Sequence, residues 1–292
     1  TLTDRKKRVG YNKRSRFYEI GFFIMKIVVV GMSGFVGTAL KHYFEERGDE
    51  VLGISIRETT SLDSIVYLID NSDVCINLAG ATIMNRWSER YKKILRSSRL
   101  KTTQTLVEAI KRCVNPPSVL LNASAVGVYD DSHQHDESST YYANDFLANL
   151  VHDWEQSALQ AVSDKTRVAL MRFGVIYGKG GGAMAKMLPP FRLGLGGNMG
   201  SGFQIVSWIH LMDLIRAMEF IIQNSSVQGV VNMTSPEPIS NMHQTKIMAK
   251  ILKRPAFFDL PEWLIKIIFG EGSSVMLDSK EVYPKVLQDA GF

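Results

Sequence analysis

A glycine-rich turn that follows a short apolar run constrains this chain more than any other feature. Residues 26–30 are mostly β-branched, the turn follows directly, and an amphipathic stretch then runs to Gly48, which indicates a strand, a turn and a helix. The turn has the sequence Gly31-Met32-Ser33-Gly34-Phe35-Val36-Gly37. Glycines with this spacing permit a sharp turn, the approach of a pyrophosphate and close helix packing. We predict that this loop binds a dinucleotide; the alternative is a turn in an α/β fold with an empty crevice.

The next 140 residues or so continue the alternation of strands and helices. Apolar runs predict strands at residues 51–56, 74–79, 119–124 and 167–173, and helical patterns occupy residues 35–48, 87–112 and 143–161. This alternation predicts an α/β fold with a Rossmann-type, doubly wound parallel sheet. We expect the strand at 167–173 to close the sheet.

The composition changes after residue 178. Ten glycines and prolines lie between Gly180 and Gly202, which predicts loops and a hairpin that form a pocket wall. Helical patterns at 211–223, 241–252 and 261–269, with a short pattern after Asp278, predict a smaller, mainly helical C-terminal lobe. We therefore divide the chain into a leader at residues 1–24 outside the fold, an NAD(P)-binding domain at 25–178 with a later return near 205–233, and substrate-side loops and the C-terminal lobe at 179–292.

The positive net charge of +5 lies in the leader. Seven of the 34 basic residues but only two of the 29 acidic residues lie in residues 1–24, so the rest of the chain is neutral and no nucleic-acid partner is expected. The apolar run at residues 20–24 is too short for a signal sequence, so we expect a cytoplasmic protein without a membrane partner. We interpret the leader as an upstream extension or a mistaken start; the alternative is a targeting or anion-binding tail.

The spacing of the cysteines and histidines matches no metal-binding motif. Cys75 and Cys113 show no CxxC spacing, which favours reduced structural thiols. His133 and His135 stand near two acidic residues, but no further His or Cys follows at a matching interval. We therefore predict that the chain binds no metal.

The end of the second predicted strand indicates which dinucleotide is bound. NAD-binding sites place Asp or Glu there to bind the ribose hydroxyls, whereas this chain has Ser55, Ile56 and Arg57, with Glu58 one residue further. A hydroxyl and a guanidinium suit a 2′-phosphate, which a carboxylate would repel. We therefore predict NADP(H) rather than NAD(H); the alternative is that Arg57 is a solvated charge at a strand end.

Several ungapped motifs together resemble one enzyme family. They are GMSGFVG at 31–37, NLAG at 77–80, WSERYKKILRSSR at 87–99, SAVGVY at 124–129 and RFGVIYG at 172–178. These motifs resemble the extended short-chain dehydrogenase/reductases, specifically the NAD-dependent epimerase/dehydratase relatives. Residues 180–214 look like the atypical branch labelled "epimerase family protein", which carries a small C-terminal domain of unknown function. The resemblance extends from Met25 to the C-terminus.

The resemblance implies further cofactor contacts. Leu78, Ala79 and Gly80 would line the adenosine side of the crevice, and Ile176 would approach the nicotinamide end. For these apolar residues the alternative is simple packing. Arg99 would reach toward the cofactor from the long helix; its alternative is a surface charge on that helix.

The catalytic residues that the resemblance implies are only partly present. Reductases of this superfamily use a serine together with a Tyr-x-x-x-Lys pair. Ser124 stands at the position of that serine, so the resemblance implies that it takes part in catalysis and also contacts the cofactor. No tyrosine in the sequence has a lysine four residues later. Tyr129 is the best replacement candidate, and its alternative is a tyrosine that packs in the core or a loop.

Two classes of function remain open from the sequence. The first is an NADP-dependent oxidoreductase or epimerase that acts on a small polar or sugar-type substrate. The second is a non-catalytic NADP(H)-binding sensor or assembly factor, which stays open because the catalytic Tyr/Lys pair is missing. The sequence is compatible with a homodimer and does not identify the substrate.

Overall fold

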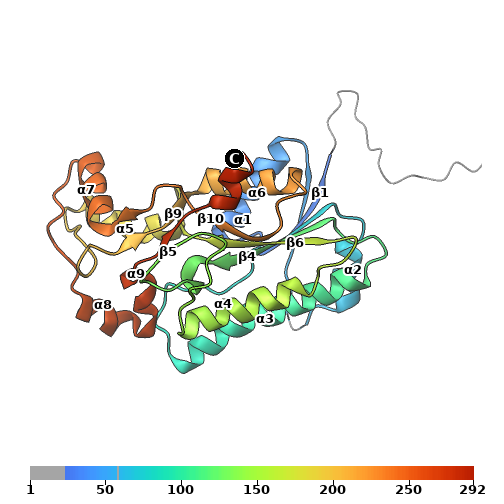
Figure 1. Cartoon of the computed structure of the whole chain (residues 1–292), viewed down its shortest axis with the longest axis horizontal. Helices are drawn as coiled ribbons and strands as arrows, with labels where there is room; N and C mark the ends of the chain where they lie inside the picture. The colour runs from blue at the N-terminus through green and yellow to red at the C-terminus, as the bar shows by residue number, and fades with distance from the viewer. Residues whose placement is uncertain (1–23, 58) are drawn as a thin grey trace, which may run out of the picture.

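A six-stranded parallel sheet forms the centre of the molecule (Figure 1). The computed structural model describes residues 24–57 and 59–292. In spatial order the strands are β2 (Glu50–Ile54), β1 (Lys26–Val30), β3 (Val74–Asn77), β4 (Val119–Ala125), β6 (Arg167–Phe173) and β10 (Gly229–Met233). Every neighbouring pair is parallel. The chain moves outward from β1 to β2 and then returns to the other side of β1 as β3, and such a switch point places a ligand crevice at the carboxyl ends of the strands.

Helices cover both faces of this sheet. One face carries α1 (Phe35–Glu46) and α6 (Leu211–Gln223), and the other carries α2 (Leu62–Ile69), α3 (Glu89–Arg112) and α4 (Phe146–Leu159), as Figure 1 shows. This arrangement confirms the predicted doubly wound α/β class.

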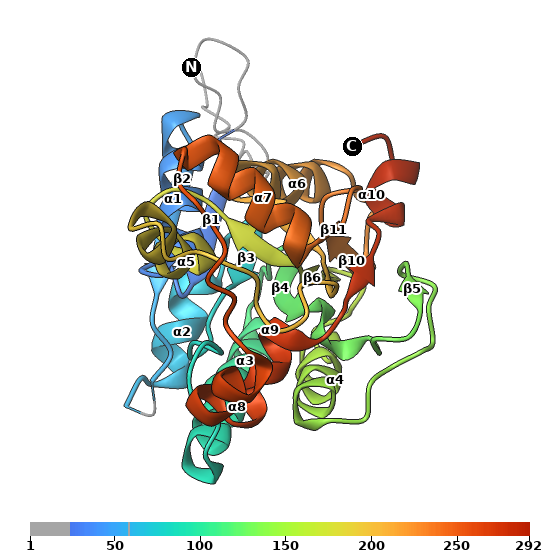
Figure 2. The same cartoon turned by 90° about the vertical axis from the view of Figure 1, so that its left-hand side faces the viewer.

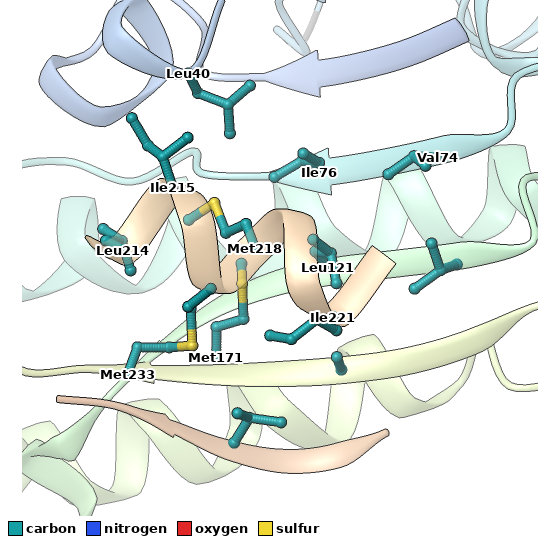
Figure 3. Close-up of a cluster of buried hydrophobic side chains, with 14 of the residues drawn as sticks. Leu40, Val74, Ile76, Leu121, Met171, Leu214, Ile215, Met218, Ile221 and Met233 are labelled. Carbon is teal, nitrogen blue, oxygen red and sulfur yellow. The ribbon is translucent and has the colours of Figure 1, made fainter. Parts of the chain in front are cut away.

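The sheet has one hydrophobic core on each face, and each strand contributes to both cores because successive side chains point to opposite faces. In β1, Ile27 and Val29 join the cluster beneath α1 and α6, whereas Val28 and Val30 join the cluster beneath α2 and α3. All four are buried. Figure 3 shows α6 lying across the first cluster, with Met218 among the side chains that face the sheet. The continuous run of β-branched residues in β1 thus reflects burial on both faces.

A smaller, mainly helical lobe lies at one end of the molecule (Figures 1 and 2). Its helices are α5 (Gly182–Arg192), α7 (Asn241–Leu252), α8 (Glu262–Phe269) and α9 (Ser274–Leu277). Three short two-stranded pairings accompany it: β7 (Val175–Tyr177) with β9 (Trp208–His210), β8 (Ile205–Val206) with β11 (Ile239–Ser240), and β12 (Glu281–Val282) with β5 (Gln134–His135). The chain ends in α10 (Lys285–Asp289).

Two predictions about this region are wrong. Residues 182–192 form a helix rather than loops or a hairpin, because Ala183 to Leu188 are good helix formers and both prolines lie in the last turns. The carbonyl of Pro189 accepts a hydrogen bond from the N–H of Leu193. The strand at 167–173 does not close the sheet, since α6 carries the chain to β10, which pairs with β6 at the edge.

Candidate functional site

The turn between β1 and α1 contains two glycines that accept no side chain. Gly31 has a φ of +87°, in the left-handed region, and an added Cβ would lie 3.0 Å from the backbone N of Ala79. At Gly37 an added Cβ would lie 2.6 Å from both Gly31 O and Met32 Cα. Because these neighbours are backbone atoms, Gly37 fixes how closely α1 approaches the turn.

The middle glycine of the turn is less confined than these two. An added Cβ at Gly34 would meet only Gly31 O, at 3.2 Å. Gly34 is the N-cap of α1, no side chain caps the helix, and its first turn contains no acidic residue. Ser33 and Gly34 are both exposed. The N-terminus of α1 therefore offers free N–H groups and a positive dipole end, which suits a pyrophosphate.

The carboxyl end of β2 lies beside this turn, because Val30 pairs with Ile54. Ser55 and Arg57 follow, and both are exposed. The Thr60 hydroxyl closes the turn: it donates to Ser55 O over 3.3 Å and accepts from Arg57 N over 3.1 Å. A hydroxyl and a guanidinium thus stand where NAD-binding sites carry a carboxylate, which fits a phosphorylated ribose.

Arg99 lies directly behind the loop that follows β3. An added Cβ at Gly80 would lie 3.0 Å from Arg99 Cζ, so glycine makes room for the guanidinium. Arg99 donates to Leu95 O over 3.3 Å and to Ala81 O over 3.1 Å, and it stacks 5.2 Å from the Trp154 ring. Burial lowers the pKa of Arg99 to about 10. Arg99 pairs with no carboxylate in the part of the chain that the structure describes, so it is a cation available to an anionic ligand.

Arg99→Met is expected to weaken NADPH binding and to leave the fold nearly as stable. The change removes the hydrogen bonds to Leu95 O and Ala81 O, but it also removes the desolvation cost of a largely buried charge that lacks a carboxylate partner, and methionine keeps an apolar stem against Trp154. We expect a dissociation constant for NADPH roughly tenfold higher, since that factor corresponds to about 1.4 kcal/mol of binding free energy. Melting curves and fluorescence titrations on one preparation measure both quantities. A large drop in melting temperature with unchanged affinity would assign Arg99 to loop support alone.

A second glycine-rich segment packs over the first turn of α1. Added Cβ atoms at Gly178 and Gly181 would lie 3.0 Å and 2.2 Å from atoms of the Phe35 ring. Phe35, Val36 and Ile176 are half-buried and pack against the core beneath α6. The side chains of Phe35 and Val36 therefore hold the turn in place, and their backbone N–H groups belong to the uncapped first turn of α1. Leu78 and Met32 also pack against this core.

Ser124 belongs to a buried ionic network. It lies in β4 and is buried, and its hydroxyl donates to Glu155 Oε1 of α4 over 2.5 Å. Arg172 of β6 donates to both oxygens of Glu155, each over 2.8 Å. Since both carboxylate oxygens accept hydrogen bonds, the single hydroxyl proton of Ser124 is committed to Glu155. In this arrangement Ser124 cannot donate to a substrate carbonyl.

Arg172 holds that network together. Burial opposes its charged form, but the hydrogen bonds and negative charge of Glu155 outweigh burial and hold the pKa of Arg172 above its ordinary value. The guanidinium also lies 4.8 Å from the Tyr129 ring and 5.6 Å from the Tyr142 ring. One of its nitrogens, Nη1, is buried without a hydrogen-bond partner. The cation is thus fixed between one carboxylate and two aromatic faces.

Tyr129 is fully buried, and its hydroxyl is directed toward β10. That hydroxyl lies 3.0 Å from Asn232 Oδ1 and 3.1 Å from Asp136 O, and the ring stacks on His135 at 4.5 Å. Burial raises the pKa of Tyr129, which makes the phenol harder to ionise. These contacts favour the packing interpretation of Tyr129 over a catalytic one.

The sequence did not single out Glu155 and Arg172. Each has a signal in retrospect, because each is a charged residue on an otherwise apolar face. Glu155 follows Val151 by four residues on the buried side of α4, and Arg172 interrupts the buried run of β6. Two opposite charges in adjacent buried elements are the pattern expected of an internal ion pair.

Other residues considered from the sequence have structural partners. His133 pairs with Asp130, and among residues 24–57 and 59–292 no cluster of three or more His, Cys, Asp or Glu is arranged to hold a metal.

Cys75 and Cys113 are free and buried, and burial raises their pKa values to about 12 and about 11. Within the same described ranges, no helix combines the length and apolar character needed to cross a membrane.

Comparison with known proteins identifies the family. A model of the NAD dependent epimerase/dehydratase family matches residues 27–233. The chain belongs to this family. A second family model, which describes a domain of unknown function (DUF1731), matches residues 260–292. The resemblance drawn from the motifs is therefore confirmed.

Relatives of this epimerase/dehydratase member align along nearly the whole chain. Cattle "Epimerase family protein SDR39U1" is 38% identical over 279 residues, which cover 92% of this chain and 95% of the relative. A crystal structure of human epimerase family protein SDR39U1 with NADPH is 36% identical, with a TM-score of 0.86 over 92% of this chain and 94% of that one. The nucleoside-diphosphate sugar epimerase of Corynebacterium glutamicum is 28% identical, with a TM-score of 0.72, and covers 91% of this chain and 54% of that one.

Proposed function

We propose that this family member binds NADP(H) and uses it as an oxidoreductase or epimerase on a small polar or sugar-type substrate. One observation carries the choice of cofactor: the exposed end of β2 presents Ser55 and Arg57 beside the open N-terminus of α1, with no carboxylate at residues 55–57. The human relative whose structure contains NADPH supports the same choice.

Residues around the switch point would hold the cofactor. They are Gly31, Met32, Ser33, Gly34, Phe35, Val36, Gly37, Ser55, Arg57, Leu78, Ala79, Gly80, Arg99, Ser124 and Ile176. When bound, the nicotinamide supplies hydride transfer. The chain contributes backbone N–H groups of the glycine turn for the pyrophosphate, Arg57 for the 2′-phosphate, and Ile176 as an apolar wall.

Proton transfer to or from the substrate must take place without the Ser and Tyr-x-x-x-Lys set that reductases of this superfamily use. The Tyr-x-x-x-Lys pair is absent from the sequence, and the Ser124 hydroxyl donates its hydrogen bond to Glu155. We infer that Ser124, Glu155 and Arg172 hold the ends of β4 and β6 in position, while another group or a water molecule exchanges the proton.

The commitment of Ser124 to Glu155 also favours the second candidate function, a non-catalytic NADP(H) sensor or assembly factor. A panel of carbonyl compounds and sugar nucleotides, assayed with the wild type and Ser124→Ala, separates the two. An enzyme gives turnover with at least one member of the panel. Turnover that Ser124→Ala leaves unchanged removes Ser124 from the mechanism, and tight NADPH binding without turnover supports the sensor.

Arg57→Ala is expected to weaken NADPH binding selectively. The substitution removes the cation proposed to bind the 2′-phosphate, which NADH lacks, so the NADH affinity should stay unchanged. A charge-assisted hydrogen bond contributes about 1.5–3 kcal/mol, so we expect the NADPH dissociation constant to rise by a factor of roughly 10 or more. Parallel titrations with both nucleotides measure the ratio, and Arg112→Ala on the exposed face of α3 is the control. An equal loss for both nucleotides would remove Arg57 from 2′-phosphate recognition.

Location and partners stay predictions. We infer no nucleic-acid partner from the neutral charge of residues 25–292, and a cytoplasmic protein because the apolar run at residues 20–24 is too short for a signal sequence. A small-molecule substrate and a homodimer also stay predictions.

A further inference from the structure

The C-terminal lobe exposes an unusual number of apolar side chains. Of the 17 large apolar side chains that are exposed in the described part of the chain, ten lie between residues 193 and 268. Ile251 is 72% exposed, Phe257 70% and Trp263 63%. Single exposed apolar residues are common, but a group of them marks an interaction surface.

Several of these side chains come from segments that lie side by side. Phe258 N donates to Gly196 O over 3.0 Å, and an added Cβ at Gly194 would lie 3.5 Å from Pro255. The rings of Phe257 and Phe258 are 4.6 Å apart. In Figure 2, α7, α8 and the segment that connects them face the viewer. We name this surface the apolar face; its members are Leu193, Leu195, Ile251, Phe257, Phe258 and Trp263.

Exposed basic residues lie next to members of the apolar face along the chain. Residues 241–270 contain five basic and two acidic residues, although the chain from residue 25 onward is neutral. The exposed cations are Arg192, Lys246, Lys250, Lys253 and Arg254, and none of them forms an ion pair with a residue that the structure describes.

The two acidic residues of this region already have partners. Asp259 accepts a hydrogen bond from Asn198 N over 2.7 Å, and Glu262 pairs with Lys266 over 2.5 Å. The face therefore presents apolar and aromatic groups together with uncompensated positive charge.

We propose that the apolar face binds the surface of a membrane that contains anionic lipids. Aromatic and aliphatic side chains enter the boundary between headgroups and acyl chains, and neighbouring lysines and arginines attract anionic headgroups. A second copy of the chain fits less well, because a twofold contact through this face would bring the same five cations together. This binding surface is separate from the proposed cofactor function.

The proposal departs from the expectation that the chain has no membrane partner. That expectation rested on the lack of a long continuous apolar run, which a membrane span requires. The apolar face instead combines residues 193–195 with residues 251–263, two segments that are distant in sequence. Each piece alone is too short to indicate a membrane contact.

Co-sedimentation of the full chain with lipid vesicles tests the proposal. The vesicles contain phosphatidylcholine alone or phosphatidylcholine with phosphatidylserine. We expect the wild type to bind the anionic vesicles, and we expect this binding to weaken as the salt concentration rises. In Phe257→Ser/Phe258→Ser and in Lys250→Glu/Arg254→Glu, the partition coefficient should fall by a factor of roughly ten or more. The control is Tyr67→Ser, since Tyr67 is 82% exposed on α2, outside the lobe.

The basic leader is present in every variant, so differences between variants report on the apolar face itself. Unchanged melting temperatures establish that each variant is folded. Absence of wild-type binding to anionic vesicles, or wild-type binding that both double variants retain, would overturn the proposal. A dimer in sedimentation velocity that Phe257→Ser/Phe258→Ser converts to a monomer would assign the face to self-association instead.

Discussion

Gly37→Ala is expected to lower both the stability of the chain and its affinity for NADPH. Its new Cβ would lie 2.6 Å from backbone atoms of Gly31 and Met32, so α1 must move away from the turn. Overpacking of this kind costs about 1–3 kcal/mol of unfolding free energy. Because the same movement displaces the N–H groups proposed to bind the pyrophosphate, we expect NADPH binding to be lost. Denaturant unfolding and nucleotide titration measure the two effects.

Gly34→Ala is the matched control from the same turn. Its Cβ would meet only Gly31 O, at 3.2 Å, and its backbone conformation, with φ of −76°, is open to any residue. Because this contact is tight but longer than the 2.6 Å contacts at Gly37, the unfolding free energy should fall less than in Gly37→Ala. The methyl group would enter the space proposed for the pyrophosphate, so the affinity should still fall. If Gly34→Ala bound NADPH as tightly as the wild type, the pyrophosphate would not lie at this glycine.

Glu155→Gln is expected to destabilise the fold more than any substitution of a surface charge. It removes the only carboxylate that pairs with the buried guanidinium of Arg172 in the described structure. Removal of one partner from a buried ion pair costs about 3–5 kcal/mol, because the remaining charge is left uncompensated. Chemical denaturation followed by circular dichroism measures this loss.

Two further variants control this experiment. Glu108→Gln breaks the 2.8 Å pair with Arg112, in which both side chains are about half exposed, and should cost no more than about 0.5 kcal/mol. Glu155→Leu/Arg172→Met replaces the whole buried pair by apolar side chains and should recover most of the loss. If Glu155→Gln were as mild as Glu108→Gln, the network would not stabilise the ends of β4 and β6.

The glycine turn and its two neighbouring elements could be predicted because their signals are local. A buried parallel strand reads as a β-branched run, and Gly31 must follow it because the chain takes a positive φ there. The bounds predicted for β1, β6, α6 and α7 agree with the structure, since each has either a continuous apolar run or a clear helical period.

Other elements lacked such signals. α2 has only eight residues, and its start rests on one hydrogen bond, in which Ser61 accepts from Ser64 N. In α5, dense glycines and prolines at both ends concealed a run of helix formers. The Ser124–Glu155–Arg172 network joins β4, α4 and β6, and no local pattern specifies which buried charges will meet.

The most direct test of the account is titration of the wild-type protein with NADPH and NADH. Nicotinamide fluorescence and the melting temperature are followed together, so that binding and stabilisation by ligand are measured on the same sample. The account predicts saturable binding of NADPH with a clear rise in melting temperature, and a much weaker response to NADH. Equal responses to the two nucleotides, or no response to either, would contradict it.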